Sequence, residues 1–246
     1  MSPLKQPTKD HMLPSGTVII LDTETGGLNA ERNPLLSVGL MIATSEEILS
    51  TLSVKFTPPE NTWLEVPIHA DQLKGKYSKE IECWLNLTTG DMTKPREEKP
   101  ARFISAVAAE VNGFVGASDV IQGWDLQKTK LWGQCTYAEG AAKIGDWIAA
   151  TNLHDPGAVL AHNAQFDKDF MLAWLPEIVP ILPETWVCTQ KAFKDKFLGG
   201  KTKGSSLGAI CKLANFSPTA EHSFHTELGD CAATHFIWGW MKGQGA

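Results

Sequence analysis

The chain has 246 residues, of which 43% are apolar, so it is long enough for one sizeable globular domain. No apolar run reaches the length of a membrane span, and residues 1–16 lack the apolar core of a signal peptide. The five cysteines are scattered without paired spacing, which argues against a disulfide framework or a zinc knuckle. We therefore expect a cytoplasmic protein with no membrane partner, in which a flexible tail over residues 1–15 precedes one domain over residues 16–246.

The net charge of -6 is unusual for a protein that binds a polyanion, because nucleic-acid-binding proteins usually carry a basic face. Residues 191–203 differ from the rest of the chain, with five lysines against one aspartate. This basic segment predicts a surface that attracts phosphates, and a solvated, lysine-rich helix end is the alternative interpretation.

The first expected element is a strand over residues 18–21, an apolar run that leads directly into Asp22, Thr23 and Glu24 and then into paired glycines. Side chains alternate between the two faces of a strand, so Asp22 and Glu24 should point the same way and can share one cation. Carboxylate oxygens are the ligands that Mg²⁺ prefers in proteins.

Residues 35–43 predict a second strand, and alternating apolar residues over 52–56 predict a third. The chain therefore opens with three strands that are expected to be antiparallel. Residues 60–100 have a mixed pattern that favours neither helix nor strand.

Apolar residues at helical spacing then predict one helix from Phe103 to Phe114 and another from Ile144 to Thr151. We interpret the stretch from Ala117 to Tyr137 as part of an insertion within residues 60–140. Strands followed by alternating helices and strands favour an α/β layered fold.

A short strand is expected at residues 159–161, after which Phe166, Phe170 and Trp174 recur at helical spacing. Asp167 should therefore lie in the first turn of a helix, where the helix dipole stabilises a carboxylate. An acid at a helix start is common, so this motif alone identifies no site.

A final helix is expected to carry Asp230 and the apolar residues Ile237, Trp238 and Met241. On a continuous helix His225 and Asp230 would lie about 140° apart, since each residue turns the helix by about 100°. His225 should therefore lie in the loop before the helix, where it can move and can serve as a base when substrate arrives.

In order, the runs from Asp22 to Leu28, from His162 to Asp167 and from His225 to Asp230 resemble the three motifs of the DEDDh family. These are DnaQ-like 3′ to 5′ exonucleases with a ribonuclease H-like fold. A sister branch has tyrosine in place of the histidine, but both tyrosines of this chain precede the second motif. The resemblance covers residue 16 to the final helix.

The resemblance implies a mixed sheet, with three antiparallel strands followed by parallel ones, flanked by helices. It implies two divalent ions, Mg²⁺ or Mn²⁺, and a histidine base, His225, that takes a proton from the attacking water. The implied metal ligands are Asp22, Glu24, Asp167 and Asp230, with Asp22 bridging both ions. The implied substrate-binding residues are Thr23, Thr25, Gly26, Leu28, Asn163 and Phe166. In the family, the backbone around Thr25 and Gly26 meets the terminal 3′ hydroxyl, and the side chain at Leu28 lies beside the last base.

The implied activity is release of nucleoside 5′-monophosphates from the 3′ end of single-stranded or frayed DNA, with a replication or repair protein as a further partner. An exoribonuclease is one alternative, because the motifs do not read the 2′ hydroxyl. A catalytically silent module that binds nucleic acid or a polymerase is another, although such a module would not need all five chemical residues. The chain departs from the family at Glu227, where a small residue is usual, and in the length of the segment between the first two motifs.

Overall fold

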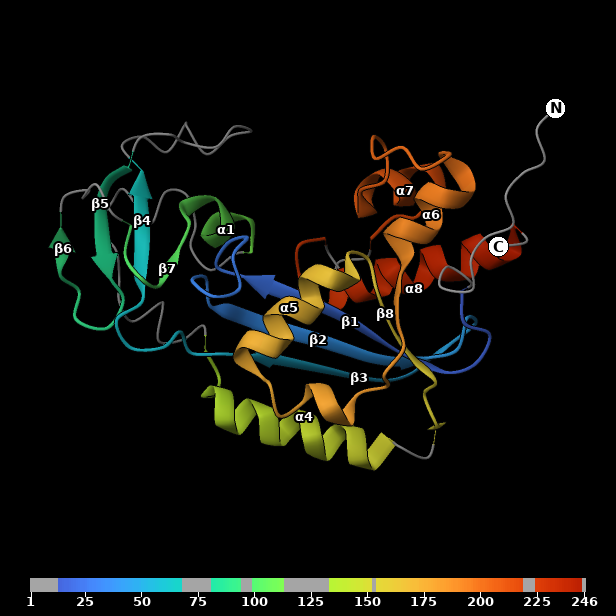
Figure 1. The fold of residues 1–246 in the computed structure, drawn as a ribbon, viewed down its shortest axis with the longest axis horizontal. Helices are drawn as coiled ribbons and strands as arrows, with labels where there is room; N and C mark the ends of the chain where they lie inside the picture. Colours follow the sequence, from blue (N-terminus) through green and yellow to red (C-terminus); the bar gives the residue numbers. More distant parts are fainter. Residues whose placement is uncertain are drawn as a thin grey trace.

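The computed structural model describes residues 13–67, 81–93, 99–112, 133–151, 154–218 and 224–244. Its centre is a five-stranded sheet in the order β3-β2-β1-β8-β9 (Figure 1). The strands are β1 (Val18–Thr25), β2 (Leu35–Ala43), β3 (Ile48–Lys55), β8 (Ala158–Ala161) and β9 (Trp186–Cys188). The first three pair in an antiparallel manner, and β8 and β9 run parallel to β1, which confirms the predicted mixed sheet.

Helices cover both faces of this sheet (Figure 1). They are α4 (Tyr137–Thr151) and α5 (Ala164–Trp174) on one face and α8 (Glu227–Gly243) on the other. Ile19 and Leu21 of β1 are buried in the core beneath α4 and α5, whereas Val18 and Ile20 pack with Trp238 of α8. Successive residues of β1 therefore enter different cores, as the alternation of a strand requires. No helix in the described ranges combines the length and the apolar character needed to cross a bilayer.

Two further helices, α6 (Thr189–Phe197) and α7 (Leu207–Leu213), pack against α8 through a cluster that includes Phe193, Ile210 and Ile237. A short 3-10 turn, η4 (Val179–Ile181), follows α5. The end of the expected tail is attached to this layer, because Leu13 packs against the core and the Trp238 indole donates to the carbonyl of Pro14 at 3.3 Å. Residues 1–12 of that tail lie outside the described residues.

A second, four-stranded sheet in the order β6-β5-β4-β7 occupies much of residues 60–104 (Figure 1). Its elements are β4 (Trp63–Pro67), β5 (Ile81–Asn86), β6 (Met92–Thr93) and β7 (Phe103–Ile104), and α1 (Ala106–Val111) follows. The helix predicted from Phe103 is wrong at its start, because Phe103 and Ile104 pair with Trp63 and Leu64 of β4. Helix α1 begins only after Ser105, whose hydroxyl accepts from the amide of Ala108. Most of the Ala117–Tyr137 segment lies outside the described residues.

Candidate active site

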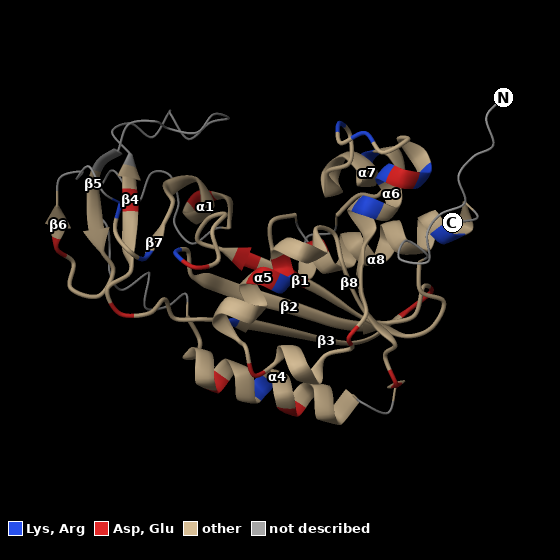
Figure 2. Cartoon of the chain, in the orientation of Figure 1, with Lys and Arg blue, Asp and Glu red and all other residues tan. Residues whose placement is uncertain are grey.

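Acidic residues lie where β1 ends, next to α5 (Figure 2). Asp22 pairs with Gly39 of β2, and Glu24 pairs with Ser37 two residues further along the same strand. Both acids therefore point to the face that α8 covers, as the alternation of the strand predicted.

The N-terminus of α8 brings a third acid to this face. The Thr226 hydroxyl caps the helix by accepting from the amide of Gly229 at 3.1 Å, and Asp230 lies in the first turn. Asp22, Glu24 and Asp230 each offer a carboxylate oxygen within 4.8 Å of the other two. Oxygens at this spacing can be drawn onto one divalent ion.

Asp167 reaches the end of β1 from the opposite face of the sheet. It is the acid in the first turn of α5, as predicted, and only 4% of it is exposed. Its Oδ1 accepts from the backbone amide of Thr23 at 3.0 Å and from the Thr23 hydroxyl at 2.8 Å. Thr23 was expected to bind substrate, but its side chain points away from Asp22 and holds Asp167 instead.

Burial raises the pKa of all four acids, and the charges of neighbouring acids raise it further at Asp22, Glu24 and Asp167. The pKa of Asp22 is raised well above its ordinary value by burial and then by the charges of Asp167 and Glu24. Burial is also the main cause that raises the pKa of Glu24 to about 8 and that of Asp167 to about 7. Burial raises the pKa of Asp230 as well, although the charge of His225 lowers it. Four ionised carboxylates at this site therefore need a compensating positive charge.

The Glu24 side chain supplies a test of whether metal fits here. Its Oε1 is buried and has no hydrogen-bond partner. A buried carboxylate oxygen without a partner is unfavourable unless a cation compensates for the lost water. The surrounding donors are all hard carboxylate oxygens, which suit Mg²⁺ or Mn²⁺. The residues present therefore fit a site for hard divalent cations.

Glu227, the residue that departs from the family pattern, is buried between α8 and the sheet. Its carboxylate accepts from the hydroxyls of Ser37 at 3.2 Å and Ser53 at 2.5 Å. Gly39 makes room for it, because a Cβ there would lie 2.5 Å from the backbone oxygen of Glu227. Glu227 thus does not crowd the site, and its charge contributes to raising the pKa of Asp22.

His225 lies two residues before α8, outside the helix as expected, and it is exposed. Its φ of 62° is in the left-handed region, which is uncommon for residues other than glycine. Its backbone amide donates to Asp230 Oδ1 at 3.3 Å and so fixes this turn beside the acids. The imidazole therefore stands at the rim of the acid cluster.

The loop after β1 carries most of the other residues that the resemblance placed near substrate. Leu28 is 81% exposed, so its side chain is free to contact a base. The Thr25 hydroxyl donates to the carbonyl of Gly27 at 2.6 Å, and the Gly26 amide donates to the carbonyl of Pro34 at 2.8 Å. The Thr25 hydroxyl and the Gly26 amide therefore already donate to groups of the protein. Neither is free to donate to a 3′ hydroxyl in this structure.

Asn163 and Phe166 lie at the start of α5. Asn163 is exposed at the N-cap, and its side chain makes no capping hydrogen bond. Phe166 is half-buried and packs against the ring of Phe170, with 4.8 Å between the ring centroids. Asn163 is therefore available to a ligand, whereas Phe166 is partly committed to the core.

His162 has a structural role that the sequence did not reveal. The ring is buried and bridges two segments, with Nδ1 3.1 Å from the Thr189 hydroxyl and Nε2 3.0 Å from the carbonyl of Ser205. A carbonyl only accepts, so Nε2 carries the proton and Nδ1 accepts from Thr189. Burial lowers the pKa of His162 to about 4, which keeps the ring neutral.

Part of the predicted basic segment lines a groove next to Asn163. Lys191 and Lys194 of α6 face Lys168 of α5 across a groove of about 630 Å³. The Lys168 ammonium lies 5.6 Å from the centre of the Trp186 ring on β9. We call this the lysine groove, and Figure 2 shows basic residues on α6 above the sheet.

The described architecture is the ribonuclease H-like fold of DEDDh 3′ exonucleases. No protein-family model matches the sequence, and no curated protein matches it. The likeness is to solved structures at 10 to 12% identity and shows the fold.

Three of these structures illustrate the range of similar proteins. The nuclease domain of 3′hExo, a DEDDh family member bound to rAMP, is 12% identical over 94% of each chain, with a TM-score of 0.56. A 3′-exonuclease that recognises the histone mRNA stem-loop is 10% identical over 94% of this chain and 83% of that one, with a TM-score of 0.53. The zinc-bound E. coli ExoI complex with single-stranded DNA is 10% identical over 93% of this chain and 41% of that one, with a TM-score of 0.56.

Proposed function

We propose that this protein is a metal-dependent 3′ to 5′ exonuclease that acts on single-stranded or frayed DNA ends. One observation carries the proposal. Three motifs that are far apart in sequence place oxygens of Asp22, Glu24 and Asp230 within 4.8 Å of one another, and Thr23 holds Asp167 beside them. An acid cluster of this kind, with a buried and unpartnered oxygen on Glu24, is unfavourable by itself and is suited to cations that bind a phosphate.

The four acids would hold two divalent ions, which when bound would neutralise the phosphate charge and favour ionisation of the attacking water. The protein's contribution is to fix the ligands. Asp22 and Glu24 are set by the pairing of β1 with β2, Asp230 by the capped first turn of α8, and Asp167 by Thr23. Rigid ligands of this kind lower the reorganisation needed for catalysis.

His225 would accept the proton of the attacking water on a ring nitrogen. The water oxygen forms a new bond to phosphorus, and the bond from phosphorus to the 3′ oxygen of the preceding nucleotide breaks. The leaving 3′ oxygen takes a proton from solvent, so the products are a nucleoside 5′-monophosphate and a strand that is one residue shorter with a new 3′ hydroxyl. The exposed imidazole of His225 is accessible to a water molecule, and histidine is the side chain that most often serves as a general base.

The three similar structures are a nuclease domain bound to rAMP, a 3′-exonuclease that recognises the histone mRNA stem-loop and a complex with single-stranded DNA. The lysine groove supports a polyanionic substrate, since three lysines and one glutamate line it on a chain of net charge -6. We take DNA as the first substrate. An exoribonuclease is the second candidate, which the two RNA-related structures favour.

The test is to incubate the protein with end-labelled DNA and RNA of the same sequence, with Mg²⁺ or with a chelator. We expect stepwise shortening from the 3′ end with Mg²⁺, none with chelator, and none for Asp22→Asn. Faster release from RNA would make the protein an exoribonuclease. Binding of both strands without cleavage under any metal condition would instead indicate a silent binding module.

A further inference from the structure

The four-stranded sheet has two faces of different character. Leu64, Val66, Leu85 and Ile104 point to one face and form a core with Leu36 of β2. Because side chains alternate along strands, the residues between them point to the other face. That outer face carries Trp63, Trp84 and Phe103 on three different strands. Large aromatic side chains thus lie on the face that does not form the core.

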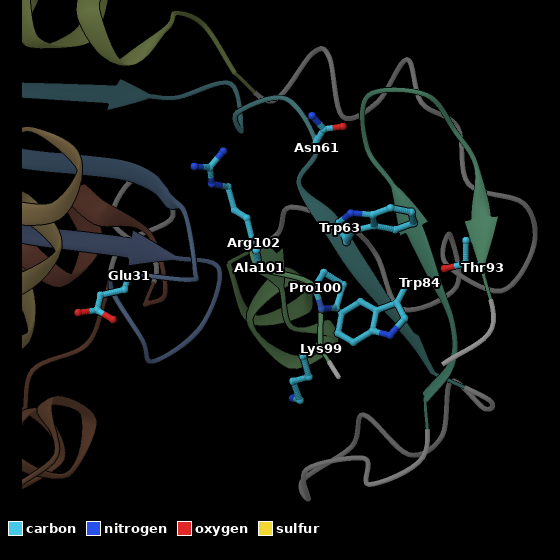
Figure 3. Close-up of a pocket in the computed structure, with 9 residues that line it drawn as sticks. All are labelled: Glu31, Asn61, Trp63, Trp84, Thr93, Lys99, Pro100, Ala101 and Arg102. Carbon is cyan, nitrogen blue, oxygen red and sulfur yellow. The ribbon is translucent and has the colours of Figure 1, made fainter. Parts of the chain in front are cut away.

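A groove of about 600 Å³ lies over the two tryptophans of this face, Trp63 and Trp84 (Figure 3). It is lined by Glu31, Asn61, Trp63, Trp84, Thr93, Lys99, Pro100, Ala101 and Arg102. We call it the tryptophan groove. Figure 3 shows the rings of Trp63 and Trp84 rising from adjacent strands, with Thr93 on one side and Lys99 to Arg102 on the other.

The aromatic residues of the outer face differ in how much of each ring is exposed to solvent. Trp84 is only 2% exposed and meets the edge of Phe103, with 5.4 Å between the ring centroids. Phe103 in turn lies beneath Arg32 and Lys99, which are 5.3 Å and 4.9 Å from its centre. Trp63 remains partly exposed in the groove. Trp84 therefore forms the floor, and Trp63 is the ring that a ligand can reach.

The tryptophan groove is joined directly to the loop after β1. The Asn33 side chain donates to the carbonyl of Phe103 at 2.8 Å, and the Ser105 amide donates to the carbonyl of Gly26 at 2.7 Å. The Asn112 side chain donates to the carbonyl of Thr25 at 2.8 Å. The second sheet is thus hydrogen-bonded to the segment that presents Leu28, so a strand that passes Leu28 can continue into the groove.

We propose that the tryptophan groove binds single-stranded nucleic acid and holds the substrate strand upstream of its terminal nucleotide, with one base stacked on Trp63. This role rests on the proposed exonuclease function. The chemistry is complementary: an aromatic face accepts any base, the Arg102 guanidinium can contact a phosphate, and Asn61 and Thr93 can bond base edges or sugars. Lys99 and Arg102 line the groove beside Glu31, and the Lys99 ammonium is paired with the Glu65 carboxylate at 3.1 Å.

A proline-rich peptide is the other ligand that aromatic grooves commonly accept. The link to the loop that presents Leu28 favours the nucleic acid, because Arg32 of that loop donates to the carbonyls of Lys99 and Pro100, which line the groove. A peptide ligand would leave the affinity for oligonucleotides independent of Trp63.

The test compares the wild type with Trp63→Leu, and Trp147→Leu is the matched control because Trp147 is a half-buried tryptophan on α4. Affinity for a fluorescent thymidylate dodecamer and for a dinucleotide is measured by anisotropy in chelator, where no cleavage occurs. We expect Trp63→Leu to weaken dodecamer binding roughly 5- to 100-fold, the range for loss of one base–aromatic stack, and to leave dinucleotide binding unchanged. Hydrolysis of the p-nitrophenyl ester of thymidine monophosphate should also be unchanged.

An unchanged dodecamer affinity in Trp63→Leu, or no dodecamer binding by the wild type, would overturn the proposal. Should Trp63→Leu fail to fold in a thermal melt, Arg102→Gln provides the test, with weaker dodecamer binding and a shallower salt dependence expected. A protein that binds through Trp63 but cleaves nothing with Mg²⁺ would refute the exonuclease function and keep this binding site. Cleavage of the oligonucleotide by a protein whose affinity for the dodecamer does not depend on Trp63 would support the exonuclease function and refute this binding site.

Discussion

Thr23 donates both its backbone amide and its hydroxyl to a single oxygen of Asp167. The two hydrogen bonds join β1, which carries Asp22 and Glu24, to α5 on the opposite face of the sheet. They fix the fourth acid relative to the three that converge beneath α8. Thr23 is therefore a positioning residue, and its effect on chemistry would pass through Asp167.

Thr23→Val removes the hydroxyl and keeps the shape of the side chain. A hydrogen bond to a charged group contributes about 1.5 to 3 kcal/mol, so we expect turnover to fall by about 10- to 100-fold and metal affinity to weaken. Calorimetric titration with Mn²⁺ measures the metal affinity. Thr151→Val is the control, because it removes a hydroxyl bond to the carbonyl of Trp147 within α4. Equal metal affinity in Thr23→Val and Thr151→Val would contradict the positioning role.

His225→Ala should lower turnover by about 10²- to 10⁴-fold, the usual effect of losing a general base. Its backbone bond to Asp230 does not involve the side chain, so the affinity for metal should change little. His154→Ala, at another exposed histidine, is the control and should be fully active. Near-normal turnover of His225→Ala would remove His225 from the mechanism.

Stability without metal should fall as the pH rises from about 6.5 to about 8. The folded-state pKa values of Glu24 and Asp167, about 8 and about 7, are raised above ordinary values of 4.5 and 3.8. The folded state therefore holds more protons than the unfolded state in this window, so its stability falls with rising pH until these acids ionise in the folded state as well. The pKa of His162 is lowered, so its contribution is lost only below about pH 6.5 and does not mask the effect.

Mg²⁺ should reverse this trend, because a cation bound by the folded state compensates the ionised acids. Thermal melts at several pH values, with chelator and with millimolar Mg²⁺, measure both effects. Glu24→Gln should flatten the pH dependence in chelator. A melting temperature that responds neither to pH nor to Mg²⁺ would count against the acid cluster as a metal site.

Gly39→Ala should separate α8 from the sheet. The added Cβ would lie 2.5 Å from the backbone oxygen of Glu227, so the first turn of α8 must shift and move Asp230. We expect a loss of about 1 to 3 kcal/mol in the free energy of unfolding, together with weaker metal binding. Gly145→Ala is the control, since its Cβ would approach nothing closer than 3.9 Å and alanine favours a helix. Equal melting temperatures for the two variants would show that the close contact at Gly39 does not constrain α8.

Replacing Lys191 and Lys194 with glutamine should reduce the salt dependence of oligonucleotide binding. Each lysine that contacts a phosphate contributes about one unit to the slope of log affinity against log salt concentration. Lys196→Gln is the control, because the ammonium of Lys196 donates to the carbonyl of Gln244 at the end of α8. A slope that is unchanged in the double variant would show that the lysine groove does not contact phosphates.

Local periodicity was sufficient to predict the parts of the site that one element sets by itself. The bounds of β2 agree with the predicted residues 35–43, and Asp22 and Glu24 point the same way because a strand repeats every two residues. Asp167 lies in the first turn of α5 and His225 lies before α8 for equally local reasons. These features need no knowledge of what lies on the other side of the sheet.

Contacts between distant segments decided the rest. The strand character of Phe103 comes from pairing with Trp63, forty residues earlier in the chain, and overrides a helical spacing of apolar residues. The commitment of Thr23 to Asp167 and of Glu227 to Ser37 and Ser53 likewise depends on packing between layers. The sequence by itself predicted which residues would carry the chemistry and the local placement of Asp22, Glu24, Asp167 and His225. Only the tertiary structure decided which partner holds each of them, because burial and hydrogen bonding depend on contacts that no local pattern encodes.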